Sequence, residues 1–197
     1  MKKPTGTTGS IRITSKDTSF NKIIFPNAKE DIELFIMERF VENINKQGVF
    51  FKFTSFSQNS QDDFDFSVET TNGKSDIDLM EIATLGKSSH ELASNQYNDL
   101  EFSRNILKKI LEKSTKYKSN KSSLFLLLYS TNFKFNLSEL VIQHLQYLLN
   151  RDTHCFKMIF YFSLLDGKEG YTRLLFPSEI KEFDEKRYKN NISINLL

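Results

Sequence analysis

The stretch of sequence that decides the fold lies between residues 62 and 83 and reads DDFDFSVETTNGKSDIDLMEIA. Two segments in which apolar and polar residues alternate, 64–70 and 76–84, flank Asn72 and Gly73. Alternation of this kind predicts strands with one buried face. Asn-Gly is the strongest short signal for a tight turn between two antiparallel strands. The stretch therefore predicts a β-hairpin at the centre of the fold.

Acidic residues occur at corresponding places on the two predicted strands. Asp63 and Asp65 open the first strand, and Glu81 lies near the end of the second. Because neighbouring strands are about 4.8 Å apart, we expect these carboxylates to approach one another. Mg²⁺ is bound by a few carboxylates and several waters, and such an ion activates water for attack on a phosphodiester. The pattern therefore predicts a Mg²⁺ (or Mn²⁺) site.

The segments around this hairpin predict an α/β domain. Residues 27–45 have helical periodicity, with Asn27 as the N-cap and Gly48 after the end. Residues 123–130 form a continuous apolar run, which is typical of a strand covered on both faces. The remaining expected elements are a strand at 49–56, helices at 88–113 and 136–150, a hairpin at 156–165 and 171–176, and a short helix at 178–189. This order predicts a single domain with a mixed central β-sheet flanked by helices.

An acidic residue also interrupts the apolar stripe of the first predicted helix. Glu33 projects between Phe40 and Ile44 on that helix. Burial of a carboxylate is costly without a partner, so Glu33 is a candidate for a functional role. The alternative is that Glu33 lies at the edge of the stripe and reaches water.

The element order and the acidic positions resemble those of the PD-(D/E)xK nuclease superfamily, which includes many restriction endonucleases. The resemblance covers residues 27–130 and implies a restriction-endonuclease-like fold. It implies that Asp65 and Glu81 are catalytic metal ligands, that Asp63 is an alternative to Asp65, and that Glu33 assists from the first helix. The cofactor implied is Mg²⁺ or Mn²⁺.

One motif residue of that superfamily is missing. The resemblance places a lysine two residues after Glu81, but this position is Ala83. We expect Lys52, on the neighbouring strand, to be the substitute catalytic lysine, and Lys87 is a second possibility. The commoner role of either side chain is that of a solvated surface lysine.

Charge is unevenly distributed along the 197 residues, although the net charge is only +2. Residues 1–22 form a basic segment that we expect to be a flexible arm preceding a single domain at 23–197. A second basic segment is predicted to contact nucleic acid and contains Lys108, Lys109, Lys113, Lys116, Lys118 and Lys121. The alternative for both segments is a solvated surface.

Composition narrows the function classes. The single cysteine excludes an intramolecular disulfide, and no apolar run is long enough for a membrane span or a secretory signal. We therefore expect a cytoplasmic protein. The leading hypothesis is a metal-dependent DNA endonuclease-like protein of restriction or genome-defence type. The alternatives are a catalytically degenerate nuclease fold that binds DNA, a protein partner or a second copy of itself, and a scaffold with no ancestral site.

Overall fold

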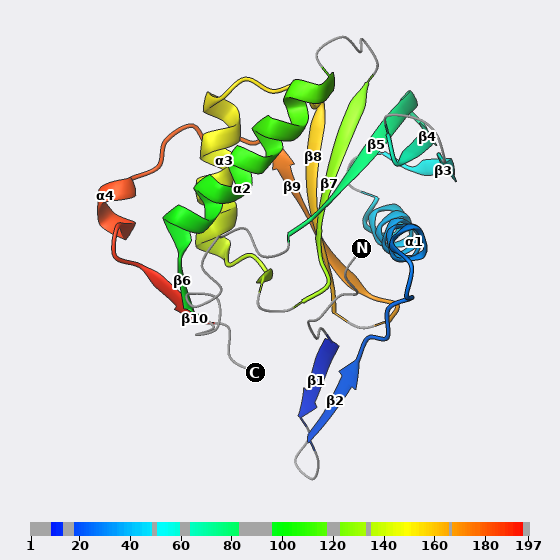
Figure 1. The fold of residues 1–197 in the computed structure, drawn as a ribbon, viewed down its shortest axis with the longest axis horizontal. Coiled ribbons are helices and arrows are strands. Elements are labelled where there is room, and N and C mark those ends of the chain that lie inside the picture. Colours follow the sequence, from blue (N-terminus) through cyan, green and yellow to red (C-terminus); the bar gives the residue numbers. More distant parts are fainter. Residues whose placement is uncertain are drawn as a thin grey trace.

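The computed structural model is a single α/β domain built on a six-stranded mixed sheet (Figure 1). It describes residues 9–13, 18–48, 51–59, 64–82, 96–117, 123–132, 135–165 and 167–194. In spatial order the strands are β3 (Phe53–Gln58), β4 (Phe66–Thr70), β5 (Gly73–Glu81), β7 (Leu124–Ser130), β8 (Met158–Leu164) and β9 (Gly170–Phe176). The parallel pairs β5–β7 and β7–β8 form the centre, and the other pairs are antiparallel. This confirms the predicted fold class.

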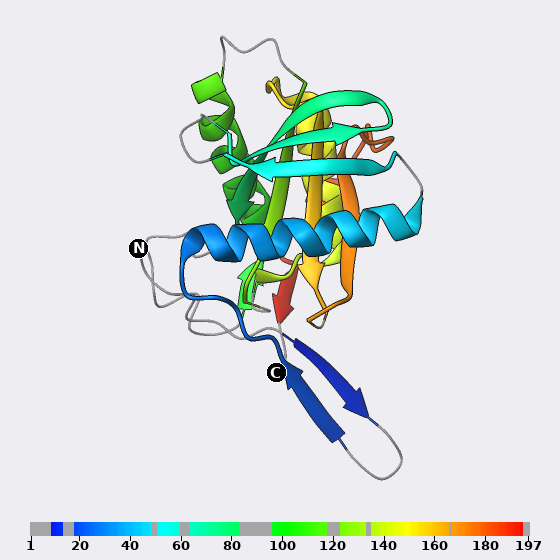
Figure 2. The ribbon, with the colours of Figure 1, turned by 90° about the vertical axis from the view of Figure 1, so that its right-hand side faces the viewer.

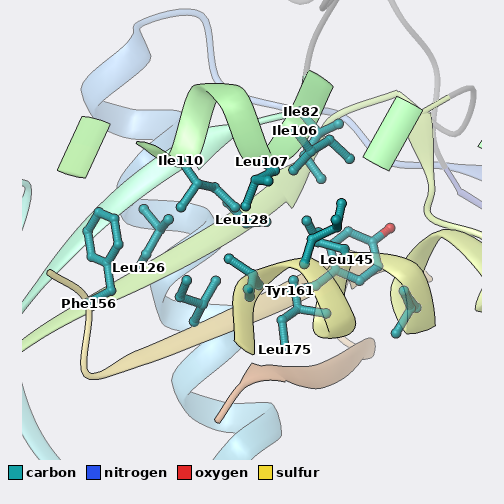
Figure 3. Close-up of a cluster of buried hydrophobic side chains, with 14 of the residues drawn as sticks. Ile82, Ile106, Leu107, Ile110, Leu126, Leu128, Leu145, Phe156, Tyr161 and Leu175 are labelled. Carbon is teal, nitrogen blue, oxygen red and sulfur yellow. The ribbon is translucent and has the colours of Figure 1, made fainter. Parts of the chain in front are cut away.

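Helices cover both faces of the sheet (Figures 1 and 2). One face packs against α1 (Lys29–Gln47), and the other packs against α2 (Asp99–Ser114) and α3 (Glu139–Arg151). Figure 3 shows the core on the α2–α3 side, where Ile106, Leu128 and Leu145 meet. Because β7 lies between both layers, all seven of its residues are buried, as its apolar run predicts.

The β4–β5 hairpin forms as its turn sequence predicts. Thr70 pairs with Gly73, whose φ of 112° is a backbone conformation that favours glycine. Register then places Phe66 opposite Ile77, so Asp65 precedes the first paired residue of β4. The carboxylate of Asp65 is therefore at the open end of the hairpin, beside the second half of β5.

The termini of the helices differ from the sequence predictions. Helix α1 has Ala28 rather than Asn27 at its N-cap, whereas Gly48 ends it in the left-handed conformation as expected. Helix α3 is capped by Ser138, whose hydroxyl accepts from the Val141 amide, and it begins two residues later than predicted. Local polar residues compete for a cap, and backbone geometry selects among them.

The second predicted helix is shorter than expected. Residues 88–95 lie outside the described residues, and α2 begins at Asp99 with the Asn98 side chain as its cap. Before it, β6 (Gln96–Asn98) pairs with β10 (Ile192–Ile194) in a two-stranded sheet. The predicted helix at 178–189 is only one turn, α4 (Glu185–Tyr188).

Two parts of the amino-terminal segment 1–22 are strands. β1 (Gly9–Ile13) and β2 (Thr18–Lys22) form an antiparallel hairpin that leads into α1. None of the helices in the described ranges combines the length and apolar character that a bilayer crossing requires.

Candidate functional site

Three predicted acidic residues come from three different elements and share one neighbourhood. Glu33 is on α1, Asp65 precedes β4, and Glu81 is the last residue of β5. Tyr129 of β7 is the register partner of Glu81. Burial, followed by the negative charges of Glu81, Glu33 and Asp65, raises the pKa of the Tyr129 phenol. The negative charges of all three carboxylates therefore act on one phenol.

Each of these carboxylates has a partner in the fold. The Asp65 Oδ2 atom accepts from the Leu79 amide at 2.6 Å, and a Glu81 oxygen accepts from the Thr131 hydroxyl. Glu33 is 5% exposed, and its Oε1 atom is 3.1 Å from the Lys29 ammonium. These contacts fix the orientation of the acidic side chains within the fold.

Glu33 is buried, which excludes the alternative that it reaches water at the edge of the helix stripe. Burial and the neighbouring charge of Asp65 raise the pKa of Glu33, against the opposing effect of Lys29 and Lys113. The lysine of α1, Lys29, and the lysine of α2, Lys113, therefore both favour the ionised form of Glu33.

A fourth acidic residue, Asp78, adjoins the three on the α2 side of the sheet. Its Oδ2 atom is 2.8 Å from the Lys113 ammonium and accepts from the Tyr117 hydroxyl at 2.6 Å. The Asp78 side chain is also hydrogen-bonded to Asp65. Burial and this contact with Asp65 raise the pKa of Asp78 to about 7, although Lys113 and Tyr117 oppose the shift. Asp65 therefore bonds to Asp78 on the α2 side of the sheet and acts through its charge on Glu33 of α1.

The predicted substitute lysine lies elsewhere, so the expectation for Lys52 is wrong. Its backbone carbonyl and amide bond to Thr71, in the turn between β4 and β5. Asp65 is at the other end of β4, six residues away, which is roughly 20 Å along a strand. A lysine side chain is too short for that distance. Asp63, Ala83 and Lys87 lie outside the described residues.

The carboxylate oxygens of Asp65 and Glu81 are donors that suit a small, hard cation with few protein ligands. Among the residues that the structure describes, no group of three or more histidine, cysteine or carboxylate side chains is arranged to hold a metal. Mg²⁺ is commonly bound by one or two carboxylates and several waters. Asp65 and Glu81 are the candidates for such a pair: a Glu81 oxygen accepts from Thr131, whereas the Asp65 carboxyl bonds both to the Leu79 amide and to Asp78.

The described lysines of the second basic segment differ in their surroundings. Lys109 pairs with Glu112 of the same helix, and Lys113 is held by Asp78. Lys108 and Lys116 are exposed. Lys118 and Lys121 lie outside the described residues. One residue predicted to bind nucleic acid, Lys113, thus lies beside the acidic cluster.

Sequence reasoning missed the roles of Asp78, Lys113, Tyr117 and Tyr129. A signal for Asp78 was present, because it lies inside an apolar run on the face opposite Glu81, where a buried carboxylate needs partners. Its partners Lys113 and Tyr117 are 35 and 39 residues away along the chain, on α2 and the following 3₁₀ turn (Thr115–Tyr117). Only the packing of these elements brings them together.

A second polar cluster attaches the carboxyl-terminal segment to α2 and α3. His144 is fully buried, with Nδ1 2.5 Å from the Ser103 hydroxyl and Nε2 3.1 Å from Glu185. The Ser103 hydroxyl is also buried and lies 2.9 Å from the Leu100 carbonyl of its own helix. A buried serine bonded to its own backbone is closed to substrate, so this serine–histidine–glutamate set is structural.

Replacement of His144 by Gln is expected to flatten the pH dependence of stability between pH 5.5 and 7. Burial lowers the pKa of His144 despite its hydrogen bond to Glu185, while Arg104 and Arg151 oppose protonation. The unfolded chain therefore binds this proton more readily, and stability is lost as pH falls below about 6.5. Urea unfolding at several pH values measures the slope. An unchanged slope in His144→Gln would contradict this assignment.

No protein family, curated protein or solved structure shows significant similarity to this chain.

Proposed function

We propose that this protein is a metal-dependent phosphodiester hydrolase of the restriction-endonuclease-like type that acts on DNA. The observation that carries the proposal is that Glu33 on α1, Asp65 just before β4 and Glu81 at the end of β5 all act electrostatically on Tyr129. The sequence of elements, a helix, three strands, a helix and a strand, supports the same type of fold.

In the proposed reaction, Asp65 and Glu81 would hold Mg²⁺ or Mn²⁺, an ion that would supply an activated water and neutralise charge on the phosphate. The Leu79 amide and the Thr131 hydroxyl orient these two carboxylates. Glu33 is buried beside Lys29 and assists in positioning the water. Hydrolysis would form a bond between the water oxygen and phosphorus and break the P–O bond to the leaving nucleotide, whose oxygen would take up the proton lost by the water.

Lys113 is the proposed cation in place of the missing motif lysine. Its ammonium is 2.8 Å from Asp78, which is itself bonded to Asp65. A fixed positive charge next to the reacting phosphate stabilises the negative charge that develops in the transition state. Lys113 comes from α2, so its distance along the sequence from Glu81 does not prevent this role.

Substitution of the acidic residues and Lys113 tests this proposal. Asp65→Asn, Glu81→Gln and Lys113→Met are each expected to lower cleavage by about a hundredfold or more, because each removes charge that acts on the transition state. The assay is cleavage of plasmid, linear and single-stranded DNA with Mg²⁺ or Mn²⁺. Lys109→Met, on the same helix, and Lys52→Met are matched controls that should retain wild-type rates.

A thermal shift provides a readout that does not need turnover. Millimolar Mn²⁺ should raise the Tm of the wild type and of Lys109→Met, because binding to the folded state stabilises it. Glu81→Gln should show a smaller shift. Cleavage that survives in Glu81→Gln, or an equal metal response in both proteins, would remove Glu81 from the site.

A second candidate function is a catalytically degenerate member of this fold that acts as a binding subunit. The sequence feature that favours it is Ala83 at the position of the motif lysine. Absence of cleavage in the wild type, together with no metal-dependent rise in Tm, would favour this candidate over the hydrolase.

A further inference from the structure

Two strands near the amino terminus form a ribbon that stands away from the body of the protein. β1 and β2 pair over five positions, from Gly9 with Lys22 to Ile13 with Thr18. Figures 1 and 2 show the ribbon projecting beyond α1. Within the described part of the chain, neither strand pairs with any third strand. Because an isolated two-stranded ribbon is marginally stable in water, contact with another molecule would stabilise it.

The ribbon segment carries the positive charge of the whole protein. Residues 1–22 contain five basic residues and one acid, which gives a net charge of +4. After residue 22 there are 22 basic and 24 acidic residues, a net charge of −2. The basic residues of the segment are Lys2, Lys3, Arg12, Lys16 and Lys22. The two described strands contain Arg12 and Lys22 and no acid, and a projecting ribbon with positive charge favours a polyanion as its partner.

We infer that the β1–β2 ribbon is an arm that binds double-stranded DNA through the major groove. The major groove is about 12 Å wide and admits a two-stranded β-ribbon. Basic residues on such a ribbon contact the phosphates on both sides of the groove. The inference rests on the proposed function for its choice of DNA, and it adds duplex structure and a second contact to that function.

The base of the arm is fixed at the end of α1 that carries Glu33. Ile23, directly after β2, is 5% exposed in the core under α1, and Phe25 packs edge-on against Phe35 at 6.0 Å. Only residues 23–28 separate the ribbon from α1, a span of at most about 20 Å. The arm is thereby tethered close to the acidic cluster, so one duplex can contact both.

Removal of charge from the arm tests this inference. The triple variant Arg12→Ser, Lys16→Ser, Lys22→Ser is compared with a matched control, Lys46→Ser, Lys157→Ser, Lys181→Ser, which removes three exposed charges elsewhere. Anisotropy with a 30-base-pair duplex in EDTA, a length chosen to be about three helical turns, measures affinity at several salt concentrations. The arm variant should bind about tenfold more weakly or worse at 0.1 M salt, with a salt slope smaller by about 2–3. The control should match the wild type.

Several outcomes would overturn the inference. The first is an equal loss of duplex affinity in both triple variants, and the second is no binding of the duplex by the wild type. The third is that the arm variant loses as much affinity for single-stranded DNA of the same length as for the duplex. Arm-dependent self-association without DNA binding, measured by sedimentation, would assign the ribbon to a second copy of this chain instead. Circular dichroism of each variant verifies that the domain remains folded.

In this design, the proposal for the arm and the proposal for the acidic cluster can be rejected independently of each other. Arm-dependent duplex binding without cleavage supports the arm and removes the proposed catalysis. Metal-dependent cleavage, with the affinity for the duplex and the salt slope unchanged in the arm variant, would support the proposed catalysis and reject the arm. Glu81→Gln should bind the duplex in EDTA as the wild type does, because Glu81 is assigned to the metal and not to the arm.

Discussion

Phe40→Ala is expected to lower the free energy of unfolding by about 3–5 kcal/mol, the range for loss of a buried phenylalanine. Phe40 is fully buried on α1. Its ring lies 5.4 Å from that of Phe160, 5.7 Å from Phe53 and 5.9 Å from Phe162. These partners belong to β3 and β8, so the cavity would form where the helix meets both halves of the sheet. Urea unfolding of wild type and variant measures the loss.

The matched control for this cavity is Phe35→Ala on the same helix. Phe35 is only partly buried and packs against Phe25 and Arg39, outside the centre of the sheet. Removal of the Phe35 ring should lower the free energy of unfolding clearly less than removal of the Phe40 ring. Equal losses for both variants, or a loss below about 1 kcal/mol for Phe40→Ala, would contradict the described packing of α1 on the sheet.

Asp78→Asn is expected to remove a large decrease in stability between pH 4 and pH 8. Burial and the contact with Asp65 raise the pKa of Asp78 to about 7. From about pH 4 to pH 7 the folded protein keeps a proton that the unfolded chain has lost, so stability falls as pH rises. The full effect of a shift from 3.8 to about 7 is on the order of 4 kcal/mol. Asparagine stays neutral at every pH, so the variant lacks this pH-dependent loss of stability.

Urea unfolding at pH 5, 6, 7 and 8 measures this difference. The stability of Asp78→Asn relative to the wild type should increase with pH and become constant above pH 8. Tyr117→Phe is the companion variant, because the Tyr117 hydroxyl favours the ionised form of Asp78. Loss of the Tyr117 hydroxyl should move the pH-dependent decrease in stability to higher pH. Parallel profiles for wild type and Asp78→Asn would show that Asp78 ionises alike in folded and unfolded chains.

The sequence was sufficient for elements whose signals are local. The β4–β5 hairpin follows from Asn72 and Gly73, because few residues other than glycine adopt the φ that this turn requires. β7 follows from its uninterrupted apolar run, and the end of α1 from Gly48. The predicted cap at Asn27 was wrong by one residue, because backbone geometry places Ala28 there without a side-chain cap bond, and the helix predicted over 136–150 begins only after the Ser138 cap.

The candidate site was only partly accessible from the sequence. Asp65, Glu81 and Glu33 could be singled out because each is an acidic residue at a conspicuous place in a periodic pattern. The substitute cation could not be found in this way. Lys52 was chosen for its position on an adjacent strand, but antiparallel register puts it at the far end of β4 from Asp65.

By itself the sequence determined the strand and helix order, the central hairpin and the acidic residues that flank it, because these depend on periodicity and turn geometry over a few residues. Tertiary structure alone decided that Lys113 and Tyr117 contact Asp78 and that the charges of three carboxylates act on Tyr129. It also decided that Glu33 is buried. The physical reason is that a buried charge is stabilised by whichever partner the packing of distant elements brings within a few ångströms, and no local pattern encodes that distance.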